Sequence, residues 1–451
     1  MLQNKKITVV GSGISGIASV QLLKKHNAMI TLYDSNETLD KQKVIEQLGF
    51  EVRIVCGVFT KELEEETQLL ILSPGVPTDL PFIVLLREKG VPIWGEIQLA
   101  YRCAKGRLIG ITGTNGKTTT TALTGEIMRQ WFHDVFVVGN IGTPYTQLAE
   151  EMKEQSVTVA ELSSFQLETV QEDFIPEVSM ILNLTPDHLN RHYTMENYAN
   201  AKLNVARNQT KDQTCILNYE DSLLREYAKQ LSCRILWFSS VHKLSDGLYL
   251  EGNKILYANA GEITEICKVE ELNIIGTHNY ENAMAGIGAG LCMGVPVEYI
   301  RKGLMSFHAV EHRIEFVATK RGVDYYNDSK GTNPDAAIKG IKAMQKPTLL
   351  IGGGYDKNSE YEDWIRAFDG KVKHFVLIGQ TKEKIAKVAK EMGVASVVLK
   401  DTFEEAMQFC IEHAVAGDAV LLSPACASWG MFKNYEERGR VFKDYVKGIV
   451  E

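Results

Sequence analysis

Residues 113–119 combine glycine, lysine and threonine at a spacing that can bind phosphate. The sequence there is GTNGKTT, an apolar stretch precedes it, and a helical pattern follows from Ala122. Backbone N–H groups of a glycine-rich turn can surround an anion, and the helix N-terminus adds partial positive charge. Lys117 would then reach the outer phosphates, and the Thr118 hydroxyl would ligate Mg²⁺. The strict P-loop pattern requires glycine at residue 111, which is isoleucine here, so a glycine turn without a ligand remains an alternative.

Three further side chains of the central sequence could bind a metal ion near this loop. Glu161 ends an apolar expected strand, where a Mg²⁺ ligand is needed; the alternative is a surface or helix-capping acid. His188 follows another expected strand, either as a metal ligand or as a hydrogen-bonding residue. Lys202 lies on the apolar stripe of the helical pattern at residues 195–209. It either extends its amine to solvent or, if buried, loses its proton and can capture CO₂ as a carbamate.

The elements that would position these side chains alternate between short apolar strands and helical patterns. Strands are expected at residues 7–10, 29–33, 69–72, 135–138, 158–162, 179–184, 348–351, 374–378 and 419–422. This alternation favours an α/β protein with parallel sheets. The length of 451 residues allows about two to four domains. We therefore expect a Rossmann-like domain at residues 1–103, a P-loop-type ATPase domain at 104–309 and a second Rossmann-like α/β domain at 310–451.

The first segment has the glycine pattern of a dinucleotide-binding domain. Gly11, Gly13 and Gly16 form G-x-G-x-x-G after the first expected strand, and Asp34 ends the second one, 18 residues after Gly16. An acid in that place commonly binds a ribose hydroxyl. On this segment alone, an NAD-dependent oxidoreductase is a reasonable hypothesis. Alternatively, the glycines only allow a helix to pack closely on a strand.

Polar residues also gather after the expected strands of the last segment. The sequences DSKGTNP from Asp328, GGGYDK from Gly352 and SPACASW from Ser423 each follow a strand, and these strand ends form the binding edge of a parallel sheet. Earlier in the chain, Asn279 and Asn282 lie one turn apart at the start of a helical pattern. They either address a ligand or, in the case of Asn279, cap the helix.

Composition restricts the class of protein. Hydrophobic residues make up 45% and charged residues 24% of the chain, as in ordinary globular proteins. The net charge of −8 argues against nucleic acid as the main partner. The eight cysteines form no C-x-x-C pair, so we expect reduced thiols in a cytoplasmic protein rather than a zinc site or a disulfide framework. The sequence has no signal-peptide pattern, and its longest apolar run, near residues 283–297, is too short and interrupted to span a membrane.

Taken together, these motifs resemble the Mur ligase family over essentially the whole chain. GTNGKTT, ELSSFQLE, TPDHLNRH, YANAKLNV, GTHNYENA, HRIE, NDSKGTN, GGGYDK and SPACASW occur in that family's order and spacing. The last four and the N-terminal GSGISG are most similar to the branch that adds D-glutamate. The DNPR-type signature of the branches that add diaminopimelate or lysine is not found in this sequence.

The resemblance implies a role for individual residues of this chain. ATP phosphates and one Mg²⁺ would be held by Gly113, Thr114, Asn115, Gly116, Lys117, Thr118 and Thr119, with Glu161 as a further Mg²⁺ ligand. A second Mg²⁺ would be held by His188 and Lys202. Other ATP contacts would come from Asn279, Asn282, Arg313 and Asp328. The UDP-sugar would be held by Ser12, Gly13, Ile14, Ser15, Asp34, Ser35, Ser73 and Asn140. D-glutamate would be held by Thr332, Lys357, Ser428 and Tyr435, with Lys330 near an acyl phosphate.

The implied activity is ATP-dependent formation of an amide bond between UDP-N-acetylmuramoyl-L-alanine and D-glutamate, in peptidoglycan synthesis. It would use two Mg²⁺ ions and a carbamate on Lys202, in a cytoplasmic monomer with no membrane span. The family often has a small or aliphatic residue in place of Trp429 and phenylalanine in place of Tyr435, which leaves the shape of the amino-acid pocket open. The alternatives are the NAD-dependent oxidoreductase and a non-catalytic nucleotide sensor, which would not need Lys202 or Lys357.

Overall fold

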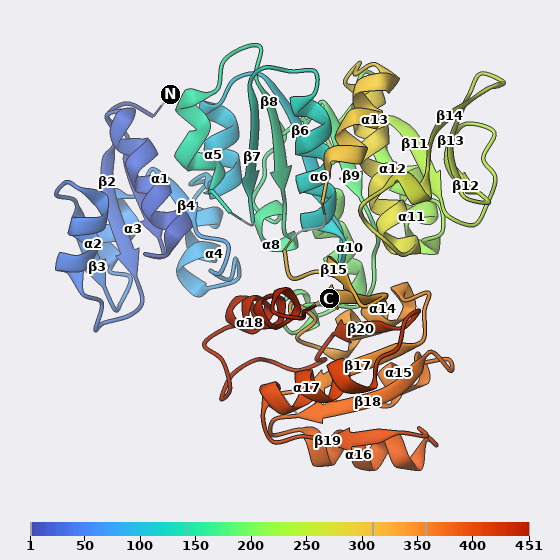
Figure 1. Cartoon of the computed structure of the whole chain (residues 1–451). Coiled ribbons are helices and arrows are strands. Elements are labelled where there is room, and N and C mark those ends of the chain that lie inside the picture. The colour runs from blue at the N-terminus through green and yellow to red at the C-terminus, as the bar shows by residue number, and fades with distance from the viewer. Residues whose placement is uncertain (1, 141, 309–310, 357–358, 451) are drawn as a thin grey trace. The chain divides into compact units, whose positions relative to one another are not determined.

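The computed structural model describes residues 2–140, 142–308, 311–356 and 359–450, and it has the α/β architecture expected from the sequence (Figure 1). The chain forms two compact units. One comprises Met1–Lys268 with Glu281–Leu304, and the other comprises Val269–Tyr280 with Met305–Glu451. Within the described residues, the first unit contains two sheets and the second unit contains one.

The N-terminal sheet has the strand order β3-β2-β1-β4-β5, and its strands pair in parallel. Its strands are β1 (Lys6–Val10), β2 (Met29–Asp34), β3 (Arg53–Cys56), β4 (Leu69–Leu72) and β5 (Ile93–Gly95). Its helices are α1 (Ile14–Lys25), α2 (Lys41–Leu48), α3 (Lys61–Glu66), α4 (Pro81–Glu88) and α5 (Glu96–Cys103). The strand order reverses between β1 and β4, so the turns after these two strands meet where such sheets bind ligands.

The central sheet has the order β14-β13-β12-β11-β10-β9-β6-β8-β7. Its strands are β6 (Arg107–Thr112), β7 (Val135–Gly139), β8 (Val157–Glu161), β9 (Val178–Ile181), β10 (Thr214–Asn218), β11 (Arg234–Ser239), β12 (Gly247–Glu251), β13 (Lys254–Asn259) and β14 (Glu262–Lys268). β13 and β14 add an antiparallel edge to a parallel sheet. Strand β6 lies between β8 and β9, with Ile111 opposite Glu161 and Thr112 opposite Ile181. This register places Glu161 beside the loop that follows β6.

Helices accompany the central sheet along the chain. They are α6 (Lys117–Arg129), α7 (Tyr145–Leu148), α8 (Ser164–Leu167), α9 (Leu189–His192), α10 (Met195–Leu203), α11 (Ser222–Tyr227), α12 (Thr277–Cys292) and α13 (Val297–Ser306), with 3₁₀ turns at Ala149–Glu151, Ala228–Gln230 and Val269–Glu271. One cluster of buried apolar side chains joins the two sheets of the first unit, with Val9 and Ile97 from the N-terminal elements and Ala160 and Phe174 from the central ones. The two sheets therefore share a core.

The sheet of the second unit has the order β15-β16-β20-β17-β18-β19. Its strands are β15 (Glu315–Lys320), β16 (Val323–Asn327), β17 (Thr348–Gly353), β18 (Val372–Ile378), β19 (Val397–Leu399) and β20 (Ala419–Leu422). Its helices are α14 (Pro334–Ala343), α15 (Glu362–Arg366), α16 (Lys382–Glu391), α17 (Phe403–His413) and α18 (Tyr435–Lys447). β15 and β16 form an antiparallel hairpin, and the remaining pairs are parallel. The polar sequences after β16, β20 and β17 therefore lie at one edge of the sheet.

The cysteines and the longest apolar run agree with their expected character. All eight cysteines lie within the described residues and are free thiols. The apolar run near residues 283–297 forms most of α12. Across the described part of the chain, no helix has both the length and the apolar character needed to cross a membrane.

Candidate active site

The predicted phosphate-binding loop joins β6 to α6, as its sequence indicates. Gly113 and Gly116 have φ angles of 147° and 87°, a conformation that favours glycine. A Cβ atom added at Gly116 would lie 2.4 Å from Oδ1 of Asn282 in α12. Asn183, just after β9, accepts a hydrogen bond from the Asn115 N–H at 2.8 Å and donates one to the Asn115 carbonyl at 3.1 Å. Neighbouring segments thus hold the loop in shape.

Two lysines converge on one carbonyl oxygen of this loop. Nζ of Lys117 donates to the carbonyl oxygens of Gly113 at 2.8 Å and Thr114 at 3.0 Å. Nζ of Lys202, in α10, also donates to the Gly113 oxygen at 2.8 Å. Burial, and next the neighbouring Lys117 cation, hold the pKa of Lys202 well below its ordinary value, against the opposite effects of Asp187 and Glu161.

The side chain of Lys202 is only 2% exposed, so the alternative in which its amine extends to solvent is wrong. The burial of Lys202 and the neighbouring Lys117 therefore both act against the protonated form of the Lys202 amine.

Glu161 is buried at the end of β8, with 2% of its surface exposed. The alternative of a surface acid is therefore wrong, and the helix cap is supplied instead by Ser163. Oε1 of Glu161 accepts a hydrogen bond from Nδ2 of Asn140 at 3.0 Å, and its carbonyl oxygen accepts one from the Asn140 N–H at 2.8 Å. Asn140, which the resemblance assigns to the UDP-sugar, thus also fixes the orientation of this carboxylate.

His188 lies at the start of α9 with a left-handed φ of 52°. Its ring centroid is 4.9 Å from that of Phe165 in α8, and its side chain is half exposed. Its Nε2 lies 3.5 Å from Oδ2 of Asp187. Metal binding and hydrogen bonding therefore both stay predictions for His188.

The donor set suits Mg²⁺ only in part. Among the described residues, no three His, Cys, Asp or Glu side chains are grouped closely enough to hold a metal ion. A magnesium site here would therefore need oxygen donors of other kinds, such as the Thr118 hydroxyl, phosphate oxygens or a carbamate on Lys202. The carboxylate of Glu161 and the hydroxyl of Thr118 are oxygen ligands of the type that Mg²⁺ prefers.

The glycine turn of the N-terminal sheet brings together part of the set predicted for the UDP-sugar. The N–H and Oγ of Ser12 donate to Oδ2 of Asp34 at 2.8 and 2.6 Å. Although partial burial opposes ionisation, hydrogen bonds from Ser12 and Asn36 hold the pKa of Asp34 below its ordinary value. Oγ of Ser73, after β4, donates to the Gly11 carbonyl at 3.3 Å.

The remaining members of that set surround the same turn. Gly13 precedes α1, Ile14 and Ser15 begin it, and Ser35 directly follows Asp34. Ile14 is 78% exposed. A Cβ atom on Gly16 would lie 1.8 Å from the Gly11 carbonyl oxygen. Gly16 therefore allows the start of α1 to pack closely on the turn after β1, which is the alternative role considered for these glycines.

In the second unit, the buried Asp328 and the partly buried Arg313 lie on either side of the β15–β16 hairpin in the sequence. Oδ2 of Asp328 accepts a hydrogen bond from Oγ of Ser423 at 2.7 Å, and Oδ1 accepts one from the Ile314 N–H at 3.3 Å. Burial raises the pKa of Asp328 to about 7, although Ser423 and Arg313 act to lower it. Nε of Arg313 is buried and has no hydrogen-bond partner among the described residues. A buried donor of this kind is the feature expected where a ligand binds.

Arg438 is a buried residue beside the candidate site that sequence reasoning missed. It lies in α18 with 1% exposure, and its guanidinium donates to the Ser329 hydroxyl at 2.9 Å, the Ser329 carbonyl at 2.8 Å and the Cys426 carbonyl at 3.2 Å. It thereby joins the loop after β16 to the loop after β20. The available signal was its position on the same helical face as Phe442 and Val446.

The other predicted residues of the second unit lie close to these loops. Ser428 is buried, and its carbonyl accepts from the N–H groups of Met431 and Phe432. Tyr435 begins α18, and its carbonyl accepts from the Ser329 hydroxyl at 2.8 Å. Nζ of Lys330 lies 5.7 Å from the centre of the Tyr435 ring.

Four further predicted ligand residues are Thr332, Lys357, Asn279 and Asn282. The Thr332 N–H donates to the Lys330 carbonyl at 2.8 Å. Lys357 lies outside the described residues. Asn279 and Asn282 fall in different units: Nδ2 of Asn279 donates to the Ile275 carbonyl at 2.8 Å, whereas Oδ1 of Asn282 accepts from Thr120 at 3.2 Å.

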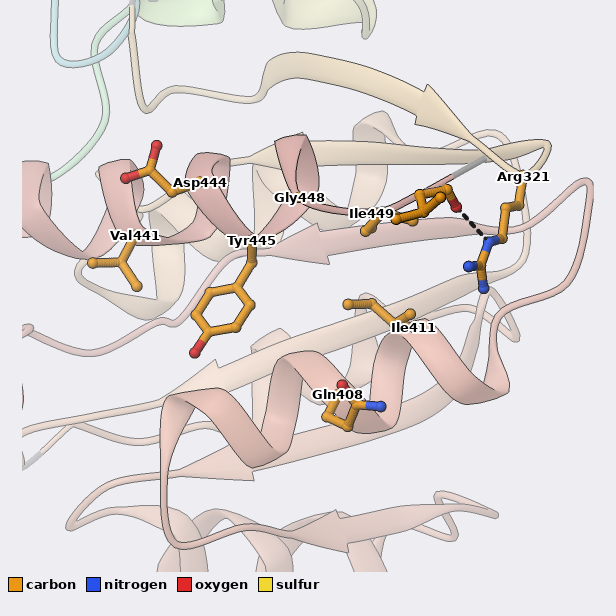
Figure 2. Close-up of a pocket in the computed structure, with 9 residues that line it drawn as sticks. Arg321, Gln408, Ile411, Val441, Asp444, Tyr445, Gly448 and Ile449 are labelled. Atoms are coloured by element: carbon orange, nitrogen blue, oxygen red, sulfur yellow. Dashed lines mark hydrogen bonds between the residues drawn. The ribbon is translucent and has the colours of Figure 1, made fainter.

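A separate hollow of about 550 Å³ in the second unit does not include any predicted site residue (Figure 2). Figure 2 shows Ile411 of α17 facing Tyr445 of α18, with Arg321 at one end, where its Nε donates to the Val450 carbonyl at 2.9 Å. The candidate site of this unit, formed by buried donors and acceptors at the strand ends, is therefore separate from this hollow.

The sequence matches three known family domains that together cover most of the chain. The N-terminal domain of MurD-like Mur ligases matches residues 5–95, the Mur ligase middle domain matches residues 111–290, and the Mur ligase glutamate ligase domain matches residues 312–426. Among solved structures, the UDP-N-acetylmuramate-alanine ligase MurC of Thermotoga maritima superposes with a TM-score of 0.59 at 19% identity, covering 98% of this chain and 99% of that one.

MurF of Acinetobacter baumannii gives a TM-score of 0.62 at 16% identity, with 98% and 93% of the two chains covered. At these identities the likeness establishes the fold.

Closer relatives match the chain nearly from end to end. The UDP-N-acetylmuramoylalanine--D-glutamate ligase of Lachnoclostridium phytofermentans is 56% identical over 447 residues, which are 99% of this chain and 98% of the relative. The protein of the same name from Lachnospira eligens is 54% identical over 449 residues, covering 99% of this chain and 100% of its own. With this identity over the full length and three matching family domains, the chain belongs to the Mur ligase family.

Proposed function

We propose that this protein is an ATP-dependent ligase that joins D-glutamate to UDP-N-acetylmuramoyl-L-alanine in peptidoglycan synthesis. The observation that carries the proposal is the convergence of Lys117 and Lys202 on the Gly113 carbonyl, in the loop beside the buried Glu161. A non-catalytic nucleotide sensor has no need for a buried, neutral lysine there. The two relatives named for this reaction support the choice of substrates.

Mur ligases use ATP and Mg²⁺. Magnesium supplies positive charge that offsets the repulsion between a carboxylate and the phosphates. In our proposal Thr118 and Glu161 hold one ion, and His188 together with a carbamate on Lys202 holds a second one. Gly113–Thr119 surround the phosphates with backbone N–H groups, and Lys117 leaves its loop carbonyls to contact the outer phosphates.

The carbamate would form without help from another protein. The neutral Nζ of Lys202 attacks the carbon of CO₂, an N–C bond forms, and one C–O π bond opens to give a carboxylate. The amine then releases one proton to water. This chemistry requires an unprotonated lysine, and the burial of Lys202 beside Lys117 favours that state.

The two chemical steps use different parts of the chain. The alanyl carboxylate attacks the γ-phosphorus of ATP, and ADP leaves. The amine of D-glutamate then attacks the acyl carbon, and inorganic phosphate leaves. We assign Asn279, Asn282, Arg313 and Asp328 to ATP, Lys330 to the acyl phosphate, and Thr332, Lys357, Ser428 and Tyr435 to D-glutamate.

We assign the UDP-sugar to the residues of the N-terminal glycine turn and its neighbours, which are Ser12, Gly13, Ile14, Ser15, Asp34, Ser35, Ser73 and Asn140. Holding reactants in line can lower the barrier by roughly 7–11 kcal/mol, and water must be excluded because it hydrolyses an acyl phosphate.

Phosphate release from ATP tests the reaction. We expect release only when UDP-N-acetylmuramoyl-L-alanine and D-glutamate are both present, with other amino acids in place of D-glutamate giving little. Release that does not need both substrates would reject the assignment.

Independently, the intact mass of the protein in bicarbonate buffer should increase by one CO₂, and Lys202→Ala should abolish the increase. The cytoplasmic location, the monomeric state and the domain boundaries at 1–103, 104–309 and 310–451 belong to the same proposal.

A further inference from the structure

A partly buried arginine connects the N-terminal sheet to the helix that begins after His188. Arg191 lies in α9, and its Nη2 donates to the Val76 carbonyl at 2.9 Å and to Oε2 of Glu168 at 2.8 Å. Val76 belongs to the loop after β4, three residues beyond Ser73, whereas Glu168 follows α8 of the central elements. The side chains of Arg191 and Glu168 are each only 15% exposed. One nitrogen atom therefore joins segments of both sheets of the first unit.

The carboxylate of Glu168 contacts one residue of the β4 loop and one residue of α9 in addition to Arg191. Its Oε2 accepts a hydrogen bond from the Thr78 hydroxyl at 3.4 Å, again from the loop after β4. Its Oε1 lies 3.4 Å from Nδ1 of His192, the last residue of α9. Nε2 of His192 lies 2.9 Å from the Ser164 hydroxyl at the start of α8. The carboxylate of Glu168 is thus the common partner of α9 and the β4 loop.

The ring of Phe165 packs against α9 and the residue that precedes it. Its ring centroid lies 4.9 Å from the ring of His188, 5.4 Å from the ring of His192 and 4.9 Å from the guanidinium carbon of Arg191. Residues with positive φ flank the helix on both sides, His188 at 52° and Tyr193 at 66°. Such conformations cost free energy and persist only where surrounding contacts impose them. The ring and the Arg191–Glu168 pair contact His188 and the helix, and the Tyr193 hydroxyl donates to Oδ2 of Asp79 in the β4 loop at 2.8 Å.

We propose that Arg191 and Glu168 are positioning residues that couple the β4 loop, residues 73–79, to the placement of His188. The inference rests on the proposed function, in which Ser73 contacts the UDP-sugar and His188 contacts a metal ion. Binding of the UDP-sugar to the β4 loop would then hold α9, and with it His188, in the conformation needed for the reaction. A pair with this little exposure can transmit such an effect, whereas exposed ion pairs contribute little.

Calorimetric binding of UDP-N-acetylmuramoyl-L-alanine, without ATP and without Mg²⁺, tests the coupling apart from catalysis. Arg191→Met removes the hydrogen bonds to Val76 and Glu168 and should weaken this binding about tenfold. Glu168→Gln should weaken it in the same direction, because Arg191 then loses its charged partner. Arg191→Lys, which keeps the charge, should lie between Arg191→Met and the unmodified protein. The double variant Arg191→Met/Glu168→Gln should be no weaker than Arg191→Met alone, since both changes break one contact.

Arg102→Met is the matched control. Arg102, in α5, also stacks on an aromatic ring, at 4.1 Å from that of Trp94, and also pairs with a carboxylate of the central elements, Asp173 at 2.7 Å. Neither Trp94 nor Asp173 belongs to the β4 loop or to α9, so the loss of Arg102 should change the dissociation constant by no more than about twofold. In the phosphate-release assay, Arg191→Met should raise the KM for the UDP-sugar substrate and leave the KM for D-glutamate unchanged.

The outcomes separate the possible explanations. If Glu168→Gln binds like the unmodified protein while Arg191→Met binds weakly, Arg191 contacts the ligand directly and the positioning pair is rejected. If Arg191→Met behaves like Arg102→Met, the coupling is also rejected. A loss of kcat with both KM values and the calorimetric affinity unchanged would indicate a structural role only and would reject the proposal. Failure of the unmodified protein to release phosphate with both substrates would instead reject the proposed function itself.

Discussion

Lys202 in the first unit and Arg438 in the second both have buried basic side chains, but they differ in the number of hydrogen-bond acceptors around them. Nζ of Lys202 donates to one carbonyl oxygen and lies near a second cation, Lys117, and its pKa is held well below the ordinary value, first by burial. The guanidinium of Arg438 donates to two carbonyls and a hydroxyl. Burial lowers its pKa only to about 10, so it stays charged near neutral pH.

The difference shows that the number and kind of partners decide what a buried cation can do. A cation with many acceptors keeps its proton and acts as a structural link between loops. A cation with few acceptors and a like-charged neighbour gives up its proton and becomes a nucleophile. The second arrangement is the one that carbamate formation requires, and it occurs at the phosphate-binding loop.

Replacing Lys202 should have the largest effect on activity. Lys202→Ala should lower kcat by at least about 10²–10³-fold, since it removes a group that organises charge in the transition state. The change also deletes the buried methylene stem of Lys202 and lowers the free energy of unfolding through the cavity that it leaves, so kcat is measured under conditions where the variant is folded. Short carboxylic acids such as acetate should restore part of the phosphate release by replacing the carbamate. Full activity of Lys202→Ala would break the comparison, because the buried amine would then have no chemical role.

Replacing Arg438 should affect stability more than any single exposed cation. Arg438→Met leaves the carbonyls of Ser329 and Cys426 without this donor and should lower the free energy of unfolding by about 3–5 kcal/mol. Urea denaturation measures the change. Arg440→Met, an exposed site on the same helix, is the control and should stay within about 0.5 kcal/mol. Equal effects at the two sites would contradict a structural link through Arg438.

Asp328 allows the comparison to be extended to a buried acid. Its pKa is raised from 3.8 to about 7, mainly by burial, so the folded chain binds more protons than the unfolded chain between these values. Stability should therefore fall as pH rises through this interval, by at most about 1.4 kcal/mol per pH unit. Asp328→Asn should remove this slope. We would measure the free energy of unfolding at pH 5 and pH 6.5, and an unchanged slope in Asp328→Asn would assign the pH dependence elsewhere.

The exposed pair Lys229–Glu226 should show the smallest effect. Its charged atoms are 2.6 Å apart, but both side chains are about 70% exposed. Lys229→Ala should change the free energy of unfolding by less than about 0.5 kcal/mol. Thermal denaturation at low and high salt provides the measurement. A large loss in this variant would mean that short distance, rather than burial and partner number, determines the effect of a cation in this protein.

The nine expected strands and the phosphate-binding loop are all present, because they depend on local patterns, whereas β10–β14 of the central sheet were not among the expected strands. The bounds of β4 and β20 agree with their continuous apolar runs, each of which ends before a Ser-Pro turn. The helical pattern at residues 195–209 was less accurate, since α10 ends at Leu203 and turns follow. The expected strand at 179–184 ends at Ile181, because Asn183 turns to the phosphate-binding loop.

Contacts between distant segments were beyond the reach of sequence patterns. The hydrogen bond from Asn140 to Glu161 depends on the pairing of β7 with β8, and the role of Asn183 depends on β9 lying next to β6. Spacing along one chain does not reveal which strands are neighbours. The links made by Arg438 and Arg191 were missed for the same reason, since each joins loops that are far apart in the sequence.

Gly116 has a consequence for which substitutions this protein can tolerate. Two independent requirements meet there, a φ of 87° and the absence of a side chain next to Oδ1 of Asn282. Shortening Asn282 to alanine would clear space but would leave the backbone requirement unmet. A selection for second-site suppressors of Gly116→Ala should therefore not recover changes at residue 282, and position 116 should accept glycine alone.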